Sequence, residues 1–190
     1  MTRRVLSAIV LALLNAAANA AANDLDELMH LLALRHHGQV SYVEQQFLAI
    51  ADRPLESSGE LIYDAPDRLE KRTLMPHPES LILAGDVLTV ERGHRHRVLD
   101  LHAFPQIRPF VESIRATLAG DRRALEAIFS LEFTGSLQRW TLRLVPLDPQ
   151  VAKTVSQVQI DGSQDQLLKI EIRQADGDRS LMTLRASAAP

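Results

Sequence analysis

Short segments in which apolar and polar residues alternate recur along the chain, and this pattern limits the possible fold most strongly. In residues 167–173, Leu168, Ile170 and Ile172 are separated by charged residues, and residues 140–144 alternate in the same way. A period of two places the apolar side chains of a strand on one face of a sheet. Such strands are typical of antiparallel sheets with one wet and one dry face, and the dry face needs a cover.

Turn residues separate these segments at short intervals. Ser57-Ser58-Gly59, Ala84-Gly85-Asp86, Asp161-Gly162 and Asp176-Gly177 are typical of turns, as is Asp64-Ala65-Pro66-Asp67. The connections are too short for crossover helices, so we expect an antiparallel meander. The expected strands are 40–50, 60–63, 69–75, 81–83, 87–90, 97–101, 131–134, 140–146, 155–160, 167–173 and 180–184.

Helical periodicity appears at the start of the mature chain and again in its middle. A helix that Asn23 or Asp24 can cap continues to Gly38, and a helical pair over residues 107–129 is divided at Gly120-Asp121. These helices would cover the dry face. The predicted fold class is therefore α+β, with a curved antiparallel sheet forming an unclosed β-barrel and a helical lid over its concave apolar face.

The first 22 residues have the pattern of a cleavable signal peptide. Two arginines precede an apolar run at residues 5–14, which is too short to span a bilayer. Small residues then predict cleavage after Ala20 or Ala22; a buried N-terminal helix is the alternative. The remaining residues 23–190 suffice for a single domain. We expect a soluble periplasmic protein.

Composition excludes several kinds of site. The chain has no cysteine, which excludes disulfides, thiolate metal sites and a cysteine nucleophile. Loss of Arg3 and Arg4 would lower the formal net charge by two, from −3 to −5, which disfavours nucleic-acid binding. Nucleotide-binding, serine-hydrolase and metalloprotease motifs do not occur in the sequence. We expect no catalytic residue, no cofactor, no metal and a monomer.

Several motifs in a fixed order carry a resemblance to a known family. Residues 58–63 (SGELIY) read as a Gly-x-Leu strand, 64–69 (DAPDRL) as an x-Pro-x-x-Leu turn, and 78–86 (PESLILAGD) as a strand closing on Gly-Asp. Residues 140–146 (WTLRLVP) and the final Asp-Gly hairpins fit the same plan. In this order they resemble the outer-membrane lipoprotein carrier (LolA-like) family over nearly the whole mature chain.

The resemblance implies an unclosed antiparallel barrel with a helical lid over an apolar cavity. The family carries acylated lipoproteins between the two membranes, so the implied partners are an acylated lipoprotein or lipid cargo, an inner-membrane donor complex and an outer-membrane acceptor. Family members place an arginine before the turn proline, where it latches the lid. Here that position is Ala65, and neither Arg68 nor Arg72 matches it. The chain is therefore interpreted as a divergent branch.

Aliphatic walls would suffice to hold acyl chains, because each buried methylene contributes about 0.8 kcal/mol. Apolar periodicity does not distinguish such walls from ordinary core, which is the simpler interpretation of each residue. The candidates are Leu61, Tyr63, Leu69, Leu81, Leu83, Leu88, Val90, Leu142 and Leu144 on the sheet, and Phe110, Val111 and Ile114 on the lid.

The run Gly93-His94-Arg95-His96-Arg97 is the most conspicuous polar motif. On a strand, His94 and His96 would share a face, and His102 could complete a zinc site. Because a third ligand is not determined, a solvated hairpin tip is the preferred interpretation. Contact with a cargo headgroup or an anionic membrane is a further alternative.

Two other functions stay open beside lipoprotein transport. One is an accessory protein that binds a hydrophobic pigment or glycolipid intermediate during export. The other is a sensor module that uses the same half-barrel to bind a protein.

Overall fold

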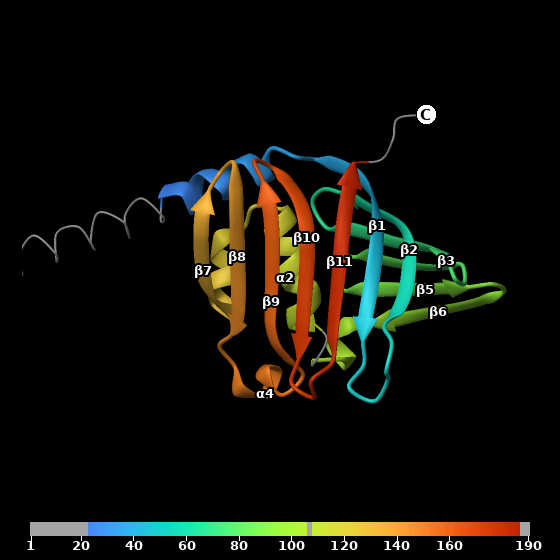
Figure 1. The fold of residues 1–190 in the computed structure, drawn as a ribbon. Coiled ribbons are helices and arrows are strands. Elements are labelled where there is room, and N and C mark those ends of the chain that lie inside the picture. The colour runs from blue at the N-terminus through green and yellow to red at the C-terminus, as the bar shows by residue number, and fades with distance from the viewer. Residues whose placement is uncertain (1–22, 106–107, 187–190) are drawn as a thin grey trace, which may run out of the picture.

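The computed structural model describes residues 23–105 and 108–186 (Figure 1). In these two ranges, eleven strands form one antiparallel sheet in the order β6-β5-β4-β3-β2-β1-β11-β10-β9-β8-β7. β1 pairs with both β2 and β11, so the first and last strands meet inside the sheet. β6 and β7 are its edges, and the barrel is unclosed. The signal peptide expected at 1–22 lies outside the described residues.

In the described residues the strands outnumber the helices. A helix over residues 23–33 opens the described chain. The strands are β1 (His37–Phe47), β2 (Leu55–Asp64), β3 (Arg68–Met75), β4 (Glu79–Ala84), β5 (Val87–Arg92), β6 (Arg95–Asp100), β7 (Phe129–Ser136), β8 (Arg139–Pro146), β9 (Val155–Ser163), β10 (Gln166–Gln174) and β11 (Arg179–Ala186). The remaining helices are η1 (Leu101–Ala103), α2 (Arg108–Leu118), α3 (Arg122–Ile128) and α4 (Pro149–Ala152).

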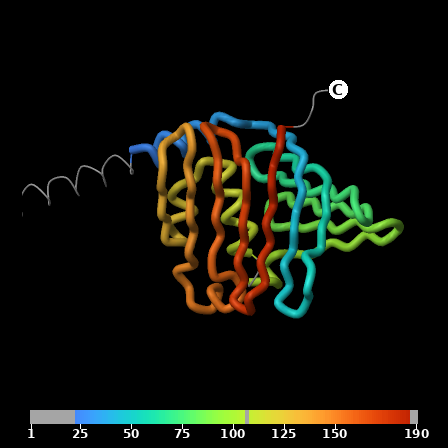
Figure 2. The backbone as a smooth tube through the Cα atoms, in the orientation of Figure 1, coloured from blue at the N-terminus to red at the C-terminus, as the bar shows by residue number. Residues whose placement is uncertain are grey.

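The sheet curls around its helices. β7–β11 are vertical in Figure 1, whereas β3, β5 and β6 run across it at the right, and Figure 2 shows the same bend in the backbone. α2 lies behind β9 and β10 in this view. The predicted class, a curved and unclosed antiparallel sheet with helices on its concave side, is confirmed. None of the helices in the described residues is long and apolar enough to cross a membrane.

The core fills one half of the concave face. Leu28 of the first helix, Leu125 of α3 and Leu142 of β8 are completely buried and belong to one apolar cluster with Trp140. The expected break between the two middle helices is confirmed, because the Asp121 side chain accepts a hydrogen bond from the Ala124 amide, 3.0 Å away, and caps α3. The other half of the concave face is not filled by this core cluster and contains a cavity.

Two predicted turns are wrong, and for one physical reason. Ser57-Ser58-Gly59 lies inside β2 and Asp161-Gly162 lies inside β9. A Cβ on Gly59 would lie 1.9 Å from the carbonyl oxygen of Arg72, and one on Gly162 would lie 2.1 Å from Trp140 Cζ2. Both glycines therefore mark places where another part of the sheet approaches the backbone closely. Glycine serves this purpose in strands as well as forming turns.

Candidate functional site

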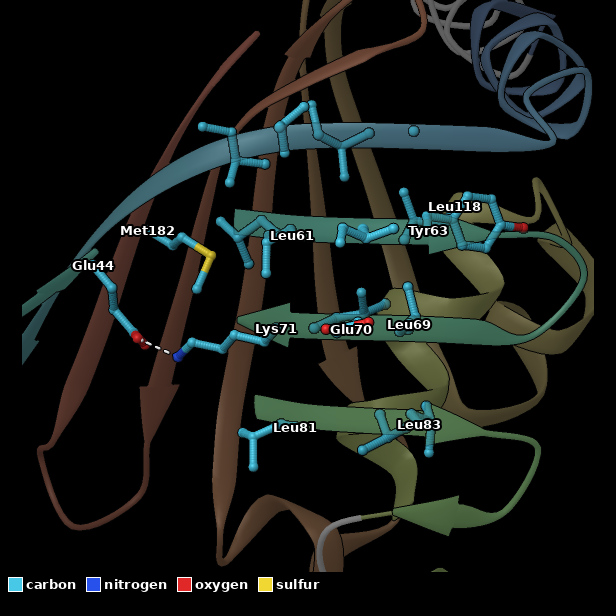
Figure 3. Close-up of a pocket in the computed structure, with 18 of the residues that line it drawn as sticks. Glu44, Leu61, Tyr63, Leu69, Glu70, Lys71, Leu81, Leu83, Leu118 and Met182 are labelled. Atoms are coloured by element: carbon cyan, nitrogen blue, oxygen red, sulfur yellow. Dashed lines mark hydrogen bonds and ion pairs between the residues drawn. The ribbon is translucent and has the colours of Figure 1, made fainter. Parts of the chain in front are cut away.

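A cavity of about 870 Å³ lies between α2 and the concave face of the sheet (Figure 3). Its size is within the usual range of ligand pockets, roughly 300–1,000 Å³. The walls come from β1–β5, β9–β11 and α2, and most of the side chains are aliphatic. The arrangement provides a sheltered apolar space that can hold hydrocarbon.

Nine of the twelve residues predicted from the sequence lie in the walls of this cavity. They come from β2 to β5 and from α2, so the structure brings the sheet side and the lid side of the prediction together. They are Leu61, Tyr63, Leu69, Leu81, Leu83, Leu88, Phe110, Val111 and Ile114. Their contact with a ligand stays a prediction.

The other three candidates lie elsewhere. Leu142 and Leu144 on β8 are fully buried in the core cluster, because the first helix and α3 cover that half of the sheet. Val90 is half-buried beside Leu81, on the strand next to the β6 edge, and is not part of the cavity wall. The packing of the helices places Leu142 and Leu144 in the core, whereas within the described residues no helix contact accounts for the position of Val90.

Sequence reasoning missed the wall formed by the other side of the sheet. The cavity is also lined by Ile170 and Ile172 of β10 and by Met182 and Leu184 of β11, which lie on the other side of β1 from β2 and β3. The alternation in residues 167–173 indicated the dry face to which the β10 pair belongs. The alternation alone does not distinguish a residue of the cavity wall from a residue of the packed core.

A charged pair is also part of the cavity wall. Lys71 of β3 reaches across β2 and forms an ion pair with Glu44 of β1, the dashed contact in Figure 3. Glu44 also accepts hydrogen bonds from the hydroxyls of Ser180, at 2.6 Å, and Ser57, at 3.3 Å. The carboxylate is therefore held from three sides by groups that donate to it.

Gly59 lies next to Tyr42, whose ring contacts Lys71. It lies in β2 directly between Tyr42 and Thr73 in the strand register. The Tyr42 hydroxyl lies 2.7 Å from Thr73 Oγ1, so the tyrosine side chain spans the position where a larger residue would project. The Lys71 ammonium lies 5.2 Å from the centre of the Tyr42 ring, which is within cation–π reach.

The electrostatics keep Glu44 ionised. Burial alone would raise the pKa of this carboxyl group, but the charge of Lys71 and the hydrogen bonds from Lys71 and Ser180 outweigh that effect and lower the pKa below its ordinary value. At neutral pH, Glu44 is therefore a carboxylate. The pair as a whole carries no net charge.

The lid is joined to the rim of the sheet by basic side chains of α2. Arg115 donates a hydrogen bond to the carbonyl oxygen of Gly85, and Arg108 Nε lies 3.7 Å from a carboxylate oxygen of Asp86. The alanine at the family's arginine position, Ala65, contributes only its backbone N–H, which donates to the carbonyl of His36 at 2.8 Å.

The two arginines near Ala65 are engaged elsewhere. Arg68 and Arg72 pair with Glu70, and Arg72 also pairs with Glu60. By the alternation of a strand, these side chains lie on the face of β3 opposite to Lys71. Neither residue therefore takes the place of the family's latch.

The histidine run lies on an exposed hairpin between β5 and β6. His94 is in the turn, and His96 lies 3.4 Å from Glu91 on the neighbouring strand. His102 contacts Asp100 and Asp86 instead of joining the other two histidines. Within the described part of the chain, no three histidine or acidic side chains lie close enough together to hold a metal ion.

Comparison with known families and structures gives one extended match in sequence. The family model described as outer membrane lipoprotein carrier protein LolA-like matches residues 17–190. No curated protein sequence matches significantly.

Matches to solved structures are distant. A LolA superfamily protein from Nitrosomonas europaea shares 10% identity over 90% of this chain and 95% of its own, with a TM-score of 0.48. A putative outer membrane lipoprotein-sorting protein domain from Vibrio parahaemolyticus shares 10% identity over 90% and 94%, with a TM-score of 0.45. A chain of the Pseudomonas aeruginosa MucA/MucB complex shares 14% identity, with a TM-score of 0.46. The match covers 88% of this chain but only 58% of that longer one.

Proposed function

The chain belongs to the LolA-like family of outer membrane lipoprotein carriers, and from this premise we propose that it is a periplasmic carrier rather than an enzyme. The cargo is an acylated lipoprotein or a related lipid, whose acyl chains are sheltered during transit toward the outer membrane. The observation that carries this proposal is the aliphatic cavity of about 870 Å³ between the sheet and α2.

The cavity supports binding without a demanding polar site. Transfer of one long acyl chain from water contributes on the order of 10 kcal/mol before costs. Ordering the flexible chain and joining two molecules offset much of that gain. The net affinity is moderate, which suits a carrier because it must also release its cargo.

The lid supplies the means of exchange. Phe110, Val111 and Ile114 of α2 line the cavity and are only half-buried, in contrast to the fully packed residues of the β8 core. Movement of α2 would widen the space for an acyl chain, and its return would close the empty form. The empty and loaded states thus compete for the same apolar surface.

The N-terminal sequence supports the proposed location in the periplasm. The arginine pair, the apolar run and the small residues before Ala20 and Ala22 are typical of export to the periplasm. An inner-membrane donor complex and an outer-membrane acceptor would be the partners of such a carrier.

Cargo identification tests this proposal directly. The chain would be produced with its own N-terminal segment in a bacterium with two membranes, purified from the periplasmic fraction without detergent, and extracted for lipid mass spectrometry. We expect an acylated peptide or an acyl lipid at a substantial molar fraction of the protein. Protein that carries no lipid and takes up no acyl ligand afterwards would contradict the proposal.

A further inference from the structure

The Lys71–Glu44 pair interrupts an otherwise aliphatic wall. Lys71 lies between Leu61 and Leu81 in the strand register, and all three line the cavity. In Figure 3 the pair is on one side of the space, while Tyr63 and Leu118 are on the other. A long amphiphilic ligand would therefore meet apolar walls over most of its length and a polar group toward one end.

Stability alone is a weak reason for such a pair. Removing two charges from water costs several kcal/mol per ion, and apolar side chains of similar volume often serve the fold as well or better. The exposed fractions of the two side chains differ, with 5% for Glu44 and 25% for Lys71. Both residues line the cavity, and Lys71 is the more accessible member of the pair.

The Lys71 ammonium group has more hydrogen-bond donors than the one that Glu44 accepts. It carries three N–H bonds, and Glu44 is its one hydrogen-bond acceptor within residues 23–105 and 108–186. The Tyr42 ring interacts with the charge through its face and uses no directed hydrogen bond. Glu44, in contrast, already accepts hydrogen bonds from Ser57, Ser180 and Lys71.

Charge balance selects the kind of acceptor. An anionic group that approached Lys71 would also approach the Glu44 carboxylate, and the repulsion would cancel much of the attraction. A neutral carbonyl oxygen can take the Lys71 donors without that repulsion. The carbonyl of an acyl ester, as in a glyceride or a glyceride-modified peptide, has both this oxygen and the attached hydrocarbon.

We propose that Lys71, held in position by Glu44, donates a hydrogen bond to the ester carbonyl of a bound acyl chain, so that the carrier prefers neutral ester-linked acyl lipids to plain hydrocarbon and to free fatty acid. This inference rests on the proposed function. It assigns a polar anchoring site within the same cavity.

Three fluorescent ligands with the same apolar body test the inference: decylpyrene, pyrenedecanoic acid and the methyl ester of that acid. Their affinities would be measured for the full mature protein at neutral pH. Lys71→Met combined with Glu44→Gln removes both charges and leaves no unpaired ion. The matched control is Arg143→Met combined with Glu132→Gln, which removes an ion pair between the neighbouring strands β7 and β8, away from the cavity wall.

We expect the ester to bind about tenfold more tightly than decylpyrene, as one hydrogen bond from a charged donor allows. The ester should also bind more tightly than the acid. The Lys71→Met/Glu44→Gln protein should lose this preference for the ester and keep its affinity for decylpyrene, while the control retains both.

Three results would overturn the inference. Equal affinity for ester and hydrocarbon in the original protein would remove the anchoring site but leave the carrier function standing. The tightest binding by the free acid would identify an anion site instead. Failure of all three ligands to bind would reject the carrier function, and the anchoring site with it.

Discussion

Arg115 Nη1 on α2 lies 3.0 Å from the carbonyl oxygen of Gly85, in the turn between β4 and β5, and joins the lid to the rim of the sheet. Arg115 also bonds to Glu112 one turn earlier on the same helix, which fixes the direction of its side chain. In this chain the lid is therefore held by an arginine of the helix itself, whereas the turn position of the family's arginine is Ala65.

Arg115→Met should make the cavity more accessible. The substitution keeps much of the side-chain length and removes a charge-assisted hydrogen bond, so the open form of α2 should become more populated. We expect an apolar fluorophore to associate about threefold faster or more in stopped-flow experiments. Arg123→Met, at an exposed position of α3, serves as the control. Equal rates for the two variants would show that Arg115 does not restrain the lid.

Leu69→Glu should abolish most of the affinity for apolar ligands. Leu69 lines the cavity from β3, and an ionised side chain there would lose hydration worth several kcal/mol. Val43→Glu introduces the same group on the sheet at a position that is 47% exposed and away from the cavity. Circular dichroism would establish that both proteins fold. If both variants bind a pyrene-labelled lipid like the original protein, the cavity is not the binding site.

The stability of the fold should depend on pH through Glu44. Its pKa is lowered in the folded protein, so the unfolded chain takes up a proton first as the pH falls. The stabilisation is complete above the ordinary value of 4.5 and is lost as the pH falls through the lower folded value. Glu44→Gln should therefore be less stable than the original protein at pH 7, and the difference should shrink in acid.

Thermal melting of both proteins across the acidic range measures that difference. Glu171 also has a lowered pKa, because the bonds and charges of Arg173 and its basic neighbours outweigh the effect of its burial. Both proteins will therefore lose stability in acid, and only the gap between them reports on Glu44. A gap that stays constant with pH would contradict the assignment.

The local parts of the fold could be predicted from sequence, because they depend on neighbours along the chain. Period-two alternation identified β8 and β10, and the Gly120-Asp121 break separated α2 from α3. The strand expected at 60–63 is longer in the structure, where β2 is Leu55–Asp64. The pattern predicts a turn at Gly59, but this glycine lies inside the strand and allows a close approach of β3.

The site could be predicted only in part, because the hollow depends on where the helices pack. Leu142 on β8 and Leu83 on β4 have equivalent apolar patterns, yet only Leu83 lines the cavity. The Glu44–Lys71 pair joins strands that are separated in the sheet by β2. No local pattern distinguishes these two charges from the solvated charges around them.

Leu142→Ala and Leu81→Ala should separate core from cavity. Leu142 is completely buried, so its truncation should lower the free energy of unfolding by about 2–5 kcal/mol and leave ligand affinity unchanged. Leu81 is half-buried at the cavity, so its truncation should cost less stability and weaken apolar ligand binding. Urea unfolding and fluorophore titration measure the two quantities. A reversed pattern would place the hollow over β8.

Gly162→Ala should destabilise the sheet through a steric clash. The added Cβ would lie 2.1 Å from Trp140 Cζ2, and Trp140 cannot move aside freely because it is 1% exposed and its indole N–H donates to the carbonyl of Gln164 at 2.9 Å. Overpacking of this kind costs about 1–3 kcal/mol. Gly38→Ala is the matched control. Its Cβ would meet only the flexible Arg35 side chain, at 3.7 Å and 3.9 Å, and the change should alter the stability by about 0.5 kcal/mol or less. Urea unfolding followed by Trp140 fluorescence measures both. Equal stabilities would mean that the indole does not lie against the β9 backbone.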